Sequence, residues 1–240
     1  MLAFASEEPQ DVAPYLRHLA RFCESGNLVD RWEKHAGGNH PDGWGVAYRQ
    51  GDEIRLVKSG KPASTDPLLL QLAARTGRFI GHVRFASNVD TVDAGNSHPF
   101  IEMGLALAHN GTFRGKVGEE GDARKVSDTR VFLEILATRW KERTLPALAE
   151  TLREMLSDGE LVGKYSAANL LIASGERIFA FRRCRRDAGY YTLYLREGSG
   201  VAVAASQPLD DAPGWRLLAD GELLELLPSG SKSVRVAGLP

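Results

Sequence analysis

Apolar residues recur at helical spacing in four segments of the chain. Within residues 15–23, for example, Tyr15, Leu16, Leu19 and Phe22 fall on one stripe, as in an amphipathic helix. Capping residues, prolines and glycines mark where each helix starts or stops. The predicted helices lie between these signals: Tyr15 and Gly26-Asn27, Thr65-Asp66 and Gly77, Ser127-Asp128 and the stretch past Leu136, and Thr144 and Gly159.

Short apolar runs separated by Gly- and Asp-containing turns predict β-strands. These runs lie at residues 45–48, 54–57, 79–85, 105–108, 168–173, 177–181, 190–195, 201–205 and 222–227. Short strands joined by tight turns favour antiparallel hairpins and meanders. The predicted helices come in adjacent pairs, so a regular βαβ alternation is not expected. The pattern therefore predicts the α+β class.

Composition narrows the function classes. The chain has 240 residues, of which 43% are hydrophobic and 25% charged, as is ordinary for globular proteins. A formal net charge of -1 favours neither nucleic acid nor an anionic membrane as the main partner. The first ten residues do not form a signal peptide, and no run approaches the ~18–20 apolar residues that span a bilayer. We expect a cytoplasmic enzyme or binding protein.

Five short motifs follow one another along the chain. They are HPDGWGVAY at 40–48, GHVRFAS at 81–87, NSHPF at 96–100, AHNGT at 108–112 and SDT at 127–129. This ordered set resembles the class-II glutamine amidotransferases, whose glutaminase domain is an N-terminal-nucleophile hydrolase. The resemblance implies a four-layer αββα sandwich with antiparallel sheets. It covers nearly the whole chain and predicts a single glutamine amidotransferase type-2 domain over residues 1–240.

Arg84 and Asp128 are the candidate substrate-binding residues. Arg84 ends a strand-like stretch, where a guanidinium can hold a carboxylate through two parallel hydrogen bonds, although a surface arginine at a strand end has the same pattern. Asp128 stands at a helix start, where aspartate is common without any ligand. The resemblance implies that Arg84 binds the α-carboxylate of glutamine and Asp128 its α-ammonium group. Phe85 and Ser87 are expected in the same substrate site.

Asn110 and Gly111 are the candidate catalytic residues. Asn-Gly is also the commonest two-residue hairpin turn, so the dipeptide alone does not decide its role. In the functional interpretation, the Asn110 amide and the Gly111 backbone N–H form an oxyanion hole, which stabilises charge on the carbonyl oxygen during acyl transfer. The resemblance assigns these same roles to the motif.

Other residues have structural interpretations. Asp42 to Gly45 reads as a turn leading into a strand, with Trp44 lining the site. His98 and His109 are interpreted as hydrogen-bonded structural histidines rather than catalytic ones. The chain contains neither HExxH nor His/Cys pairs at metal-ligand spacing, so we expect no metal and no other cofactor.

The nucleophile of the resembled family has no counterpart in this sequence. There a cysteine directly follows the initiator methionine, and its own α-amino group serves as the base. This chain starts Met1-Leu2-Ala3, as though Met1 stood two places after that cysteine. Either a Met-Cys-Xaa extension precedes Met1, which we favour, or the protein is a pseudoenzyme.

The two internal cysteines are poor replacements. Cys23 lies on the apolar stripe of the first helix, where cysteine usually packs as a small hydrophobe. Cys184 stands among four arginines that could lower its pKa, but it is predicted on an exposed hairpin. Those arginines could also contact nucleic acid, although the rest of the chain offers no basic stripe.

Three function classes remain open. The leading one is a stand-alone amidohydrolase acting on glutamine or a γ-glutamyl small molecule, with a separate ammonia-accepting synthase as a possible partner. The second is a catalytically inactive domain that binds glutamine or regulates a partner. The third is a structural subunit in which the motifs only form turns. A homo-oligomer is a further expectation.

Overall fold

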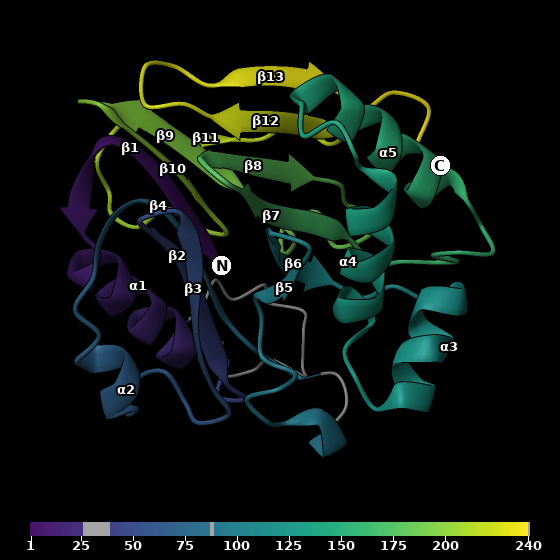
Figure 1. Cartoon of the computed structure of the whole chain (residues 1–240), viewed down its shortest axis with the longest axis horizontal. Helices are drawn as coiled ribbons and strands as arrows, with labels where there is room; N and C mark the ends of the chain where they lie inside the picture. The colour runs from purple at the N-terminus through teal and green to yellow at the C-terminus, as the bar shows by residue number, and fades with distance from the viewer. Residues whose placement is uncertain (26–38, 87–88, 240) are drawn as a thin grey trace.

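The computed structural model describes residues 1–25, 39–86 and 89–239. Two antiparallel sheets lie between layers of helices (Figure 1), which confirms the α+β class and the four-layer sandwich. The order across the first sheet is β11 (Arg216–Leu217), β9 (Tyr194–Gly198), β10 (Val201–Ala205), β1 (Leu2–Asp11), β4 (Arg75–Val83), β2 (Trp44–Gln50) and β3 (Glu53–Ser59). The order across the second is β13 (Lys232–Arg235), β12 (Glu222–Leu226), β8 (Arg177–Arg182), β7 (Ala168–Ser174), β6 (Leu105–Gly111) and β5 (Phe100–Glu102).

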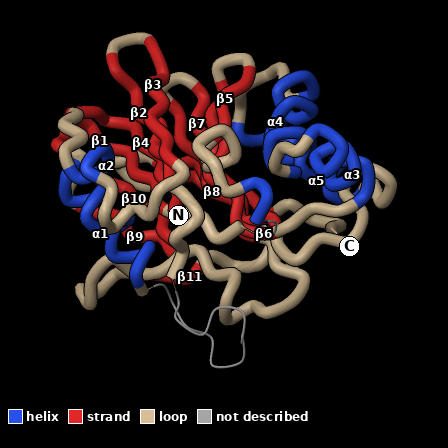
Figure 2. Tube along the Cα trace, turned by 90° about the horizontal axis from the view of Figure 1, so that it is seen from below, coloured by secondary structure: helices blue, strands red, loops and turns tan. Residues whose placement is uncertain are grey.

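Helices cover the outer face of each sheet. On the first sheet these are α1 (Ala13–Glu24) and the short α2 (Pro67–Leu70). On the second they are α4 (Asp128–Arg139) and α5 (Leu145–Ser157), with α3 (Gly115–Arg124) packed beside α4. Both views place the N-terminus between the two helical layers (Figures 1 and 2). No helix among the described residues combines the length and apolar character needed to span a membrane.

Alternation of large and small residues along the strands explains this packing. In β1, Leu2 and Phe4 pack with α1, whereas Ala3 and Ala5 face the second sheet. In β6 the leucines likewise pack under α4 and α5, and the intervening alanines face the first sheet. Because side chains alternate between the two faces of a strand, each strand contributes large groups to a helical interface and methyl groups between the sheets.

Several element boundaries differ from the sequence predictions. The second helix ends at Leu70 rather than near Gly77, because Arg75 and Thr76 already pair with β1. The strand predicted at 190–195 begins only at Tyr194. The first helix ends at Glu24, so its predicted stop at Gly26-Asn27 lies outside the described residues. The helix α3 was not predicted from the sequence, because GKVGEEGDAR contains three glycines and one large apolar residue, Val117.

Candidate functional site

Three strand ends and a helix start meet at one edge of the sandwich. The start of β1, the residues after β4, the end of β6 and the start of α4 line a common pocket. Five of the sequence-predicted site residues line it: Arg84, Phe85, Asn110, Gly111 and Asp128. The sixth, Ser87, lies outside the described residues. The fold thus brings together the end of β6, the start of α4 and the loop after β4, along with Met1 and Gln207 from distant parts of the sequence.

Arg84 is a buried cation. Its guanidinium donates hydrogen bonds to the Thr91 carbonyl oxygen at 2.5 Å and to Thr91 Oγ1 at 2.7 Å. Only 7% of the residue is exposed, and among the described residues no carboxylate lies within ion-pair distance of it. Burial lowers its pKa, while the more distant charges of Asp42, Asp93 and Asp128 act in the opposite direction. An anion entering the pocket would complete this site, because buried charges are costly without a partner.

The strand end that carries Arg84 is held by the turn before β2. The Arg84 N–H donates to the Gly43 carbonyl at 2.8 Å, and the Asp42 N–H donates to the Arg84 carbonyl at 3.0 Å. Asp42 Oδ2 accepts a further hydrogen bond from the Ala86 N–H at 2.8 Å. This agrees with the predicted structural role of the Asp42 turn.

Asp128 offers the opposite charge. It is the first residue of α4, where the positive end of the helix dipole favours a carboxylate. Asp128 Oδ2 accepts a hydrogen bond from the Phe113 N–H at 2.6 Å, and Oδ1 accepts one from the Thr129 N–H at 2.7 Å. Among the described residues its hydrogen-bond partners are neutral groups. One pocket therefore contains a carboxylate and a guanidinium that are not paired with each other.

Asn110 and Gly111 do not form a hairpin turn. They are the last residues of β6 and pair with Asn169 and Ala168 of β7. Gly111 has a φ of 149°, and a Cβ there would lie 2.0 Å from the Ala167 carbonyl oxygen. A glycine is therefore required by space as well as by backbone conformation. Both residues line the pocket, where the oxyanion-hole interpretation places them.

His98 and His109 make hydrogen bonds on both ring nitrogens, as the structural interpretation expects. His98 Nδ1 lies 3.0 Å from the His109 carbonyl oxygen, and its Nε2 lies 3.2 Å from Ser127 Oγ. His109 Nδ1 lies 3.0 Å from Thr129 Oγ1, and its Nε2 lies 3.0 Å from the Ala167 carbonyl oxygen. Burial lowers the pKa of both imidazoles, so both are neutral at pH 7.

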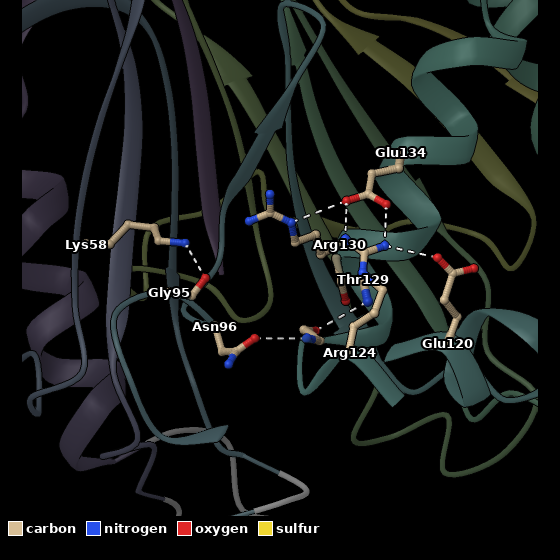
Figure 3. A network of polar contacts seen from close by, with 9 residues as sticks. Lys58, Gly95, Asn96, Glu120, Arg124, Thr129, Arg130 and Glu134 are labelled. Carbon is tan, nitrogen blue, oxygen red and sulfur yellow. Dashed lines mark hydrogen bonds and ion pairs between the residues drawn. The ribbon is translucent and has the colours of Figure 1, made fainter. Parts of the chain in front are cut away.

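The loop after Arg84 is tied to the elements on either side of it. Asn96 Oδ1 accepts a hydrogen bond from the Ser127 N–H at 2.9 Å, just before α4. On the other side, Lys58 Nζ of β3 donates to the Gly95 carbonyl at 2.9 Å. Figure 3 shows Asn96 between Lys58 and the group in which Arg124 and Arg130 contact Glu134. These contacts fix the pocket wall between the Arg84 loop and α4.

The N-terminal residue lies inside the pocket. The Met1 amino group donates a hydrogen bond to Ser206 Oγ at 3.0 Å, and the Ser206 N–H donates to the Met1 carbonyl at 2.9 Å. Burial lowers the pKa of this amine from 8.0 to about 5. The chain's two cysteines do not line the pocket: Cys23 is buried in the core as expected, and Cys184 lies outside the pocket wall.

Two sequence predictions about the surroundings of the site are wrong. Trp44 is fully buried and donates to Asp66 Oδ2 at 3.1 Å, so it packs under the helices instead of lining the pocket. The hairpin predicted around Cys184 does not form, because β8 and β9 belong to different sheets. Arg185 and Arg186 are exposed as expected, whereas Arg182 is buried and donates to three backbone carbonyls. Burial raises the pKa of the Cys184 thiol rather than lowering it.

Several residues that line the pocket were not predicted as site residues from the sequence. They are Met1, Phe22, His40, His82, Val83, Ser127, Tyr190, Ser206 and Gln207. His40 and His82 stand in the same motifs as the predicted residues, which was a usable signal. Tyr190 and Ser206 are distant in sequence, and only the pairing of β10 with β1 brings Ser206 to Met1.

Comparison with known proteins agrees with this geometry. The family described as class-II glutamine amidotransferases matches residues 28–197, more than half of the chain. The chain belongs to the class-II glutamine amidotransferases. A gamma-glutamyl-hercynylcysteine sulfoxide hydrolase of Mycolicibacterium smegmatis is 30% identical over 204 residues, covering 83% of this chain and 83% of that protein.

Two further proteins delimit what the similarity covers. An uncharacterized protein of Methanocaldococcus jannaschii is 30% identical over 225 residues, and the match covers 80% of this chain but only 62% of that protein. The chain thus spans less than two thirds of that relative. A class-II glutamine aminotransferase domain protein of Silicibacter pomeroyi has the same fold, with a TM-score of 0.63, 21% identity and 99% of each chain covered.

Proposed function

We propose that this class-II glutamine amidotransferase family member hydrolyses the γ-amide of glutamine or of a γ-glutamyl compound. One observation supports this most strongly. The buried Arg84 guanidinium, without an ion-pair partner among the described residues, shares a pocket with Asp128 and with Asn110-Gly111. The α-carboxylate of an amino acid complements the charge of Arg84, and its α-ammonium group complements that of Asp128. Asn110 and Gly111 then face an amide further along the same substrate.

The proposed reaction is acyl transfer to a thiol, followed by hydrolysis. A cysteine thiol gives its proton to its own α-amino group, and the sulfur bonds to the γ-carbonyl carbon. The Asn110 amide and the Gly111 N–H stabilise the resulting oxyanion. The C–N bond breaks, and the protonated leaving amine departs as ammonia or a larger amine. Water then attacks the thioester, which releases glutamate and the thiol.

We place the nucleophile two positions ahead of Met1, joined to β1. Side chains two residues apart in a strand lie on the same face, so such a cysteine shares the inward face of Met1 and Ala3. Met1 already lines the pocket, and the neighbouring β4 ends at Val83, directly before Arg84, on the same edge. A thiol at this position is thus directed towards the pocket of Asn110 and Gly111.

The leaving group decides the substrate. A relative named gamma-glutamyl-hercynylcysteine sulfoxide hydrolase makes a γ-glutamyl conjugate a reasonable candidate beside glutamine itself. Transfer of ammonia to a separate synthase, assembly as a homo-oligomer, a cytoplasmic location and a single domain over residues 1–240 stay predictions.

The test is to place Met-Cys-Arg in front of Met1. The small cysteine after the new methionine favours removal of that methionine, which frees the cysteine α-amino group. We expect this protein to release glutamate from glutamine or from one member of a panel of γ-glutamyl conjugates. Asn110→Ala in the same protein should lower kcat by ~10²–10³, the usual effect of losing one oxyanion donor, with a much smaller effect on KM.

The chain without the extension is the control. It should release no glutamate, because neither Cys23 nor Cys184 lies in the pocket. Glutamate release that Cys23→Ala or Cys184→Ala abolishes would contradict the proposed nucleophile. If the folded, processed, extended protein binds glutamate but hydrolyses no member of the panel, a glutamine-binding or regulatory role replaces the enzymatic one.

A further inference from the structure

We propose that His98 is a positioning residue that holds the end of β6 and the start of α4 in fixed register. It would thereby set the separation between the oxyanion hole and the ammonium-binding carboxylate. The proposal rests on the function proposed above. The evidence for this role is which residues carry the two groups that contact the His98 ring. The carbonyl that His98 contacts belongs to His109, the residue before Asn110, and the hydroxyl belongs to Ser127, the residue before Asp128.

The contacts fix where the ring proton lies. A carbonyl oxygen only accepts, so the 3.0 Å contact with the His109 carbonyl requires that His98 Nδ1 carry the proton. The His109 N–H is farther from the same nitrogen, at 3.4 Å. Because the buried ring is neutral, Nε2 accepts a hydrogen bond from the Ser127 hydroxyl at 3.2 Å. His98 is thus a donor to β6 and an acceptor from α4.

Ser127 transmits this contact to the helix start. Its Oγ accepts a hydrogen bond from the Thr129 N–H at 3.3 Å, so it is the cap of α4. The same oxygen lies 3.1 Å from Asp128 Oδ1. A hydroxyl has one proton, so while His98 accepts it, Ser127 does not donate to Asp128 Oδ1, which accepts from the Thr129 N–H at 2.7 Å and lies 3.2 Å from Thr129 Oγ1. Without His98 the Ser127 hydroxyl can turn to Asp128 Oδ1, so His98 controls one of the hydrogen bonds that orient this carboxylate.

His109 provides a parallel connection between the same two elements. Its Nε2 donates to the Ala167 carbonyl, and its Nδ1 accepts from the Thr129 hydroxyl, each at 3.0 Å. This second neutral imidazole keeps β6 near α4 if His98 is changed. His98 variants should therefore stay folded and alter the site locally, which makes them informative.

Two substitutions separate the two contacts. The amide nitrogen of asparagine occupies the place of Nδ1, so His98→Asn keeps the bond to the His109 carbonyl and loses Ser127. The amide of glutamine reaches the place of Nε2, so His98→Gln keeps Ser127 and loses the carbonyl. His98→Phe keeps the ring packing against Phe100, whose ring lies 5.0 Å away, and loses both bonds.

In the extended protein, we expect loss of the Ser127 contact to change KM and loss of the His109 carbonyl contact to change kcat. His98→Asn should raise KM about three- to tenfold with kcat nearly unchanged, the effect of one neutral hydrogen bond. His98→Gln should lower kcat by a similar factor with KM nearly unchanged. His98→Phe should show both losses. A Phe variant with the parent's kinetics, or Asn and Gln variants with the same KM and kcat changes, would overturn the proposal.

A readout without turnover separates this proposal from the proposed function. If the extended parent is inactive, the function fails, and the amide resonances of Gly111 and Thr129 then test the coupling in the chain without the extension. His98→Asn should shift Thr129 more than Gly111, and His98→Gln should shift Gly111 more than Thr129. Equal shifts of both amides in both variants would show that His98 only fills space.

Discussion

At the scale of single residues, the site is defined by charges that the protein does not neutralise by itself. Arg84 has 7% exposure, and its guanidinium bonds only to the carbonyl and hydroxyl oxygens of Thr91 among the described residues. Neutral acceptors orient the planar group but do not compensate its charge. A ligand carboxylate would both orient the guanidinium and compensate its charge. Substitutions of Arg84 and Thr91 test these two contributions.

Arg84→Lys should weaken glutamate binding, because an ammonium keeps the charge and loses the two-pronged geometry. The loss should be ~1.5–3 kcal/mol, the value of a hydrogen bond to a charged group. Thr91→Val should cost less, since it removes one of two bonds to the guanidinium. Calorimetry with glutamate measures both, with the exposed Arg130→Lys as the control. Equal binding by Arg84→Lys and the parent would remove Arg84 from the site.

Gly111→Ala should destabilise the protein by a few kcal/mol, because the added Cβ would lie within 2.6 Å of both the Ala167 carbonyl oxygen and His109 Nε2. Gly175→Ala is a matched control. Gly175 also has a positive φ, 57°, but a Cβ there meets nothing within 4 Å. It should therefore cost only about 1 kcal/mol of backbone strain. Urea unfolding distinguishes the two, and similar losses would mean that the Gly111 site has room to relax.

At the scale of elements, the pocket depends on how one loop is fixed between β3 and α4. The Asn96 side chain is buried and bonds to Asp93 Oδ2 within its own loop at 2.9 Å and to the segment before α4, through the Ser127 N–H at 2.9 Å and the Lys125 carbonyl at 3.4 Å. Arg124, by contrast, joins α3 to Glu134 of α4 on the surface. Removing the hydrogen bonds of the buried Asn96 side chain should cost stability, whereas an exposed ion pair such as Arg124–Glu134 contributes little to it.

Asn96→Ala should therefore lower both stability and glutamate affinity. It removes the buried Asn96 amide and leaves the partly buried Ser127 N–H without its acceptor, which costs about 1–3 kcal/mol, and it frees the loop that carries Thr91. Arg124→Gln is the control and should change either quantity by less than about 1 kcal/mol. Thermal unfolding and calorimetry are the measurements. If the two variants lose equal amounts, the loop is not held through Asn96.

Elements were predictable where local signals agree with tertiary pairing. Ser127 as the cap of α4 and the run at 201–205 as a strand needed only local chemistry. The second helix was predicted too long because Arg75 and Thr76 belong to β4 and pair with β1. Local capping signals carry no information about such a contact between distant segments. For the same reason Asn110-Gly111 could not be distinguished from a hairpin turn until its pairing with β7 was known.

At the scale of the whole molecule, the pocket end of the sandwich contains histidines that burial keeps neutral. His82, His98 and His109 are each at most 7% exposed, and burial lowers the pKa of each. His82 Nδ1 has no hydrogen-bond partner among the described residues. The alanine-rich interface between the two sheets ends where the pocket begins. The polar groups of the site lie at that end of the interface.

Stability should therefore fall as the pH is lowered from 6.5 to 5. The unfolded chain binds protons at histidine below pH ~6.5 while the folded protein does not, so each buried histidine removes up to about 1.4 kcal/mol per pH unit. The Met1 amine contributes up to the same slope per pH unit over a wider range, from pH 8 down to about 5, its folded pKa. Carboxylates with lowered pKa, such as Asp66 and Glu134, act mainly below pH 5 because their ordinary values are 3.8 and 4.5.

His82→Phe tests this at one ring, because it removes a buried titratable group that makes no Nδ1 hydrogen bond within the described part of the chain. Urea unfolding at pH 8, 6.5 and 5.5 should show a flatter pH dependence below 6.5 and the same dependence above it. His18→Gln is the comparison, since His18 is only partly buried and should flatten the curve less. If His82→Phe keeps the full slope of the parent, His82 is protonated in the folded protein. The charge arrangement around Arg84 would then have to include a second buried cation.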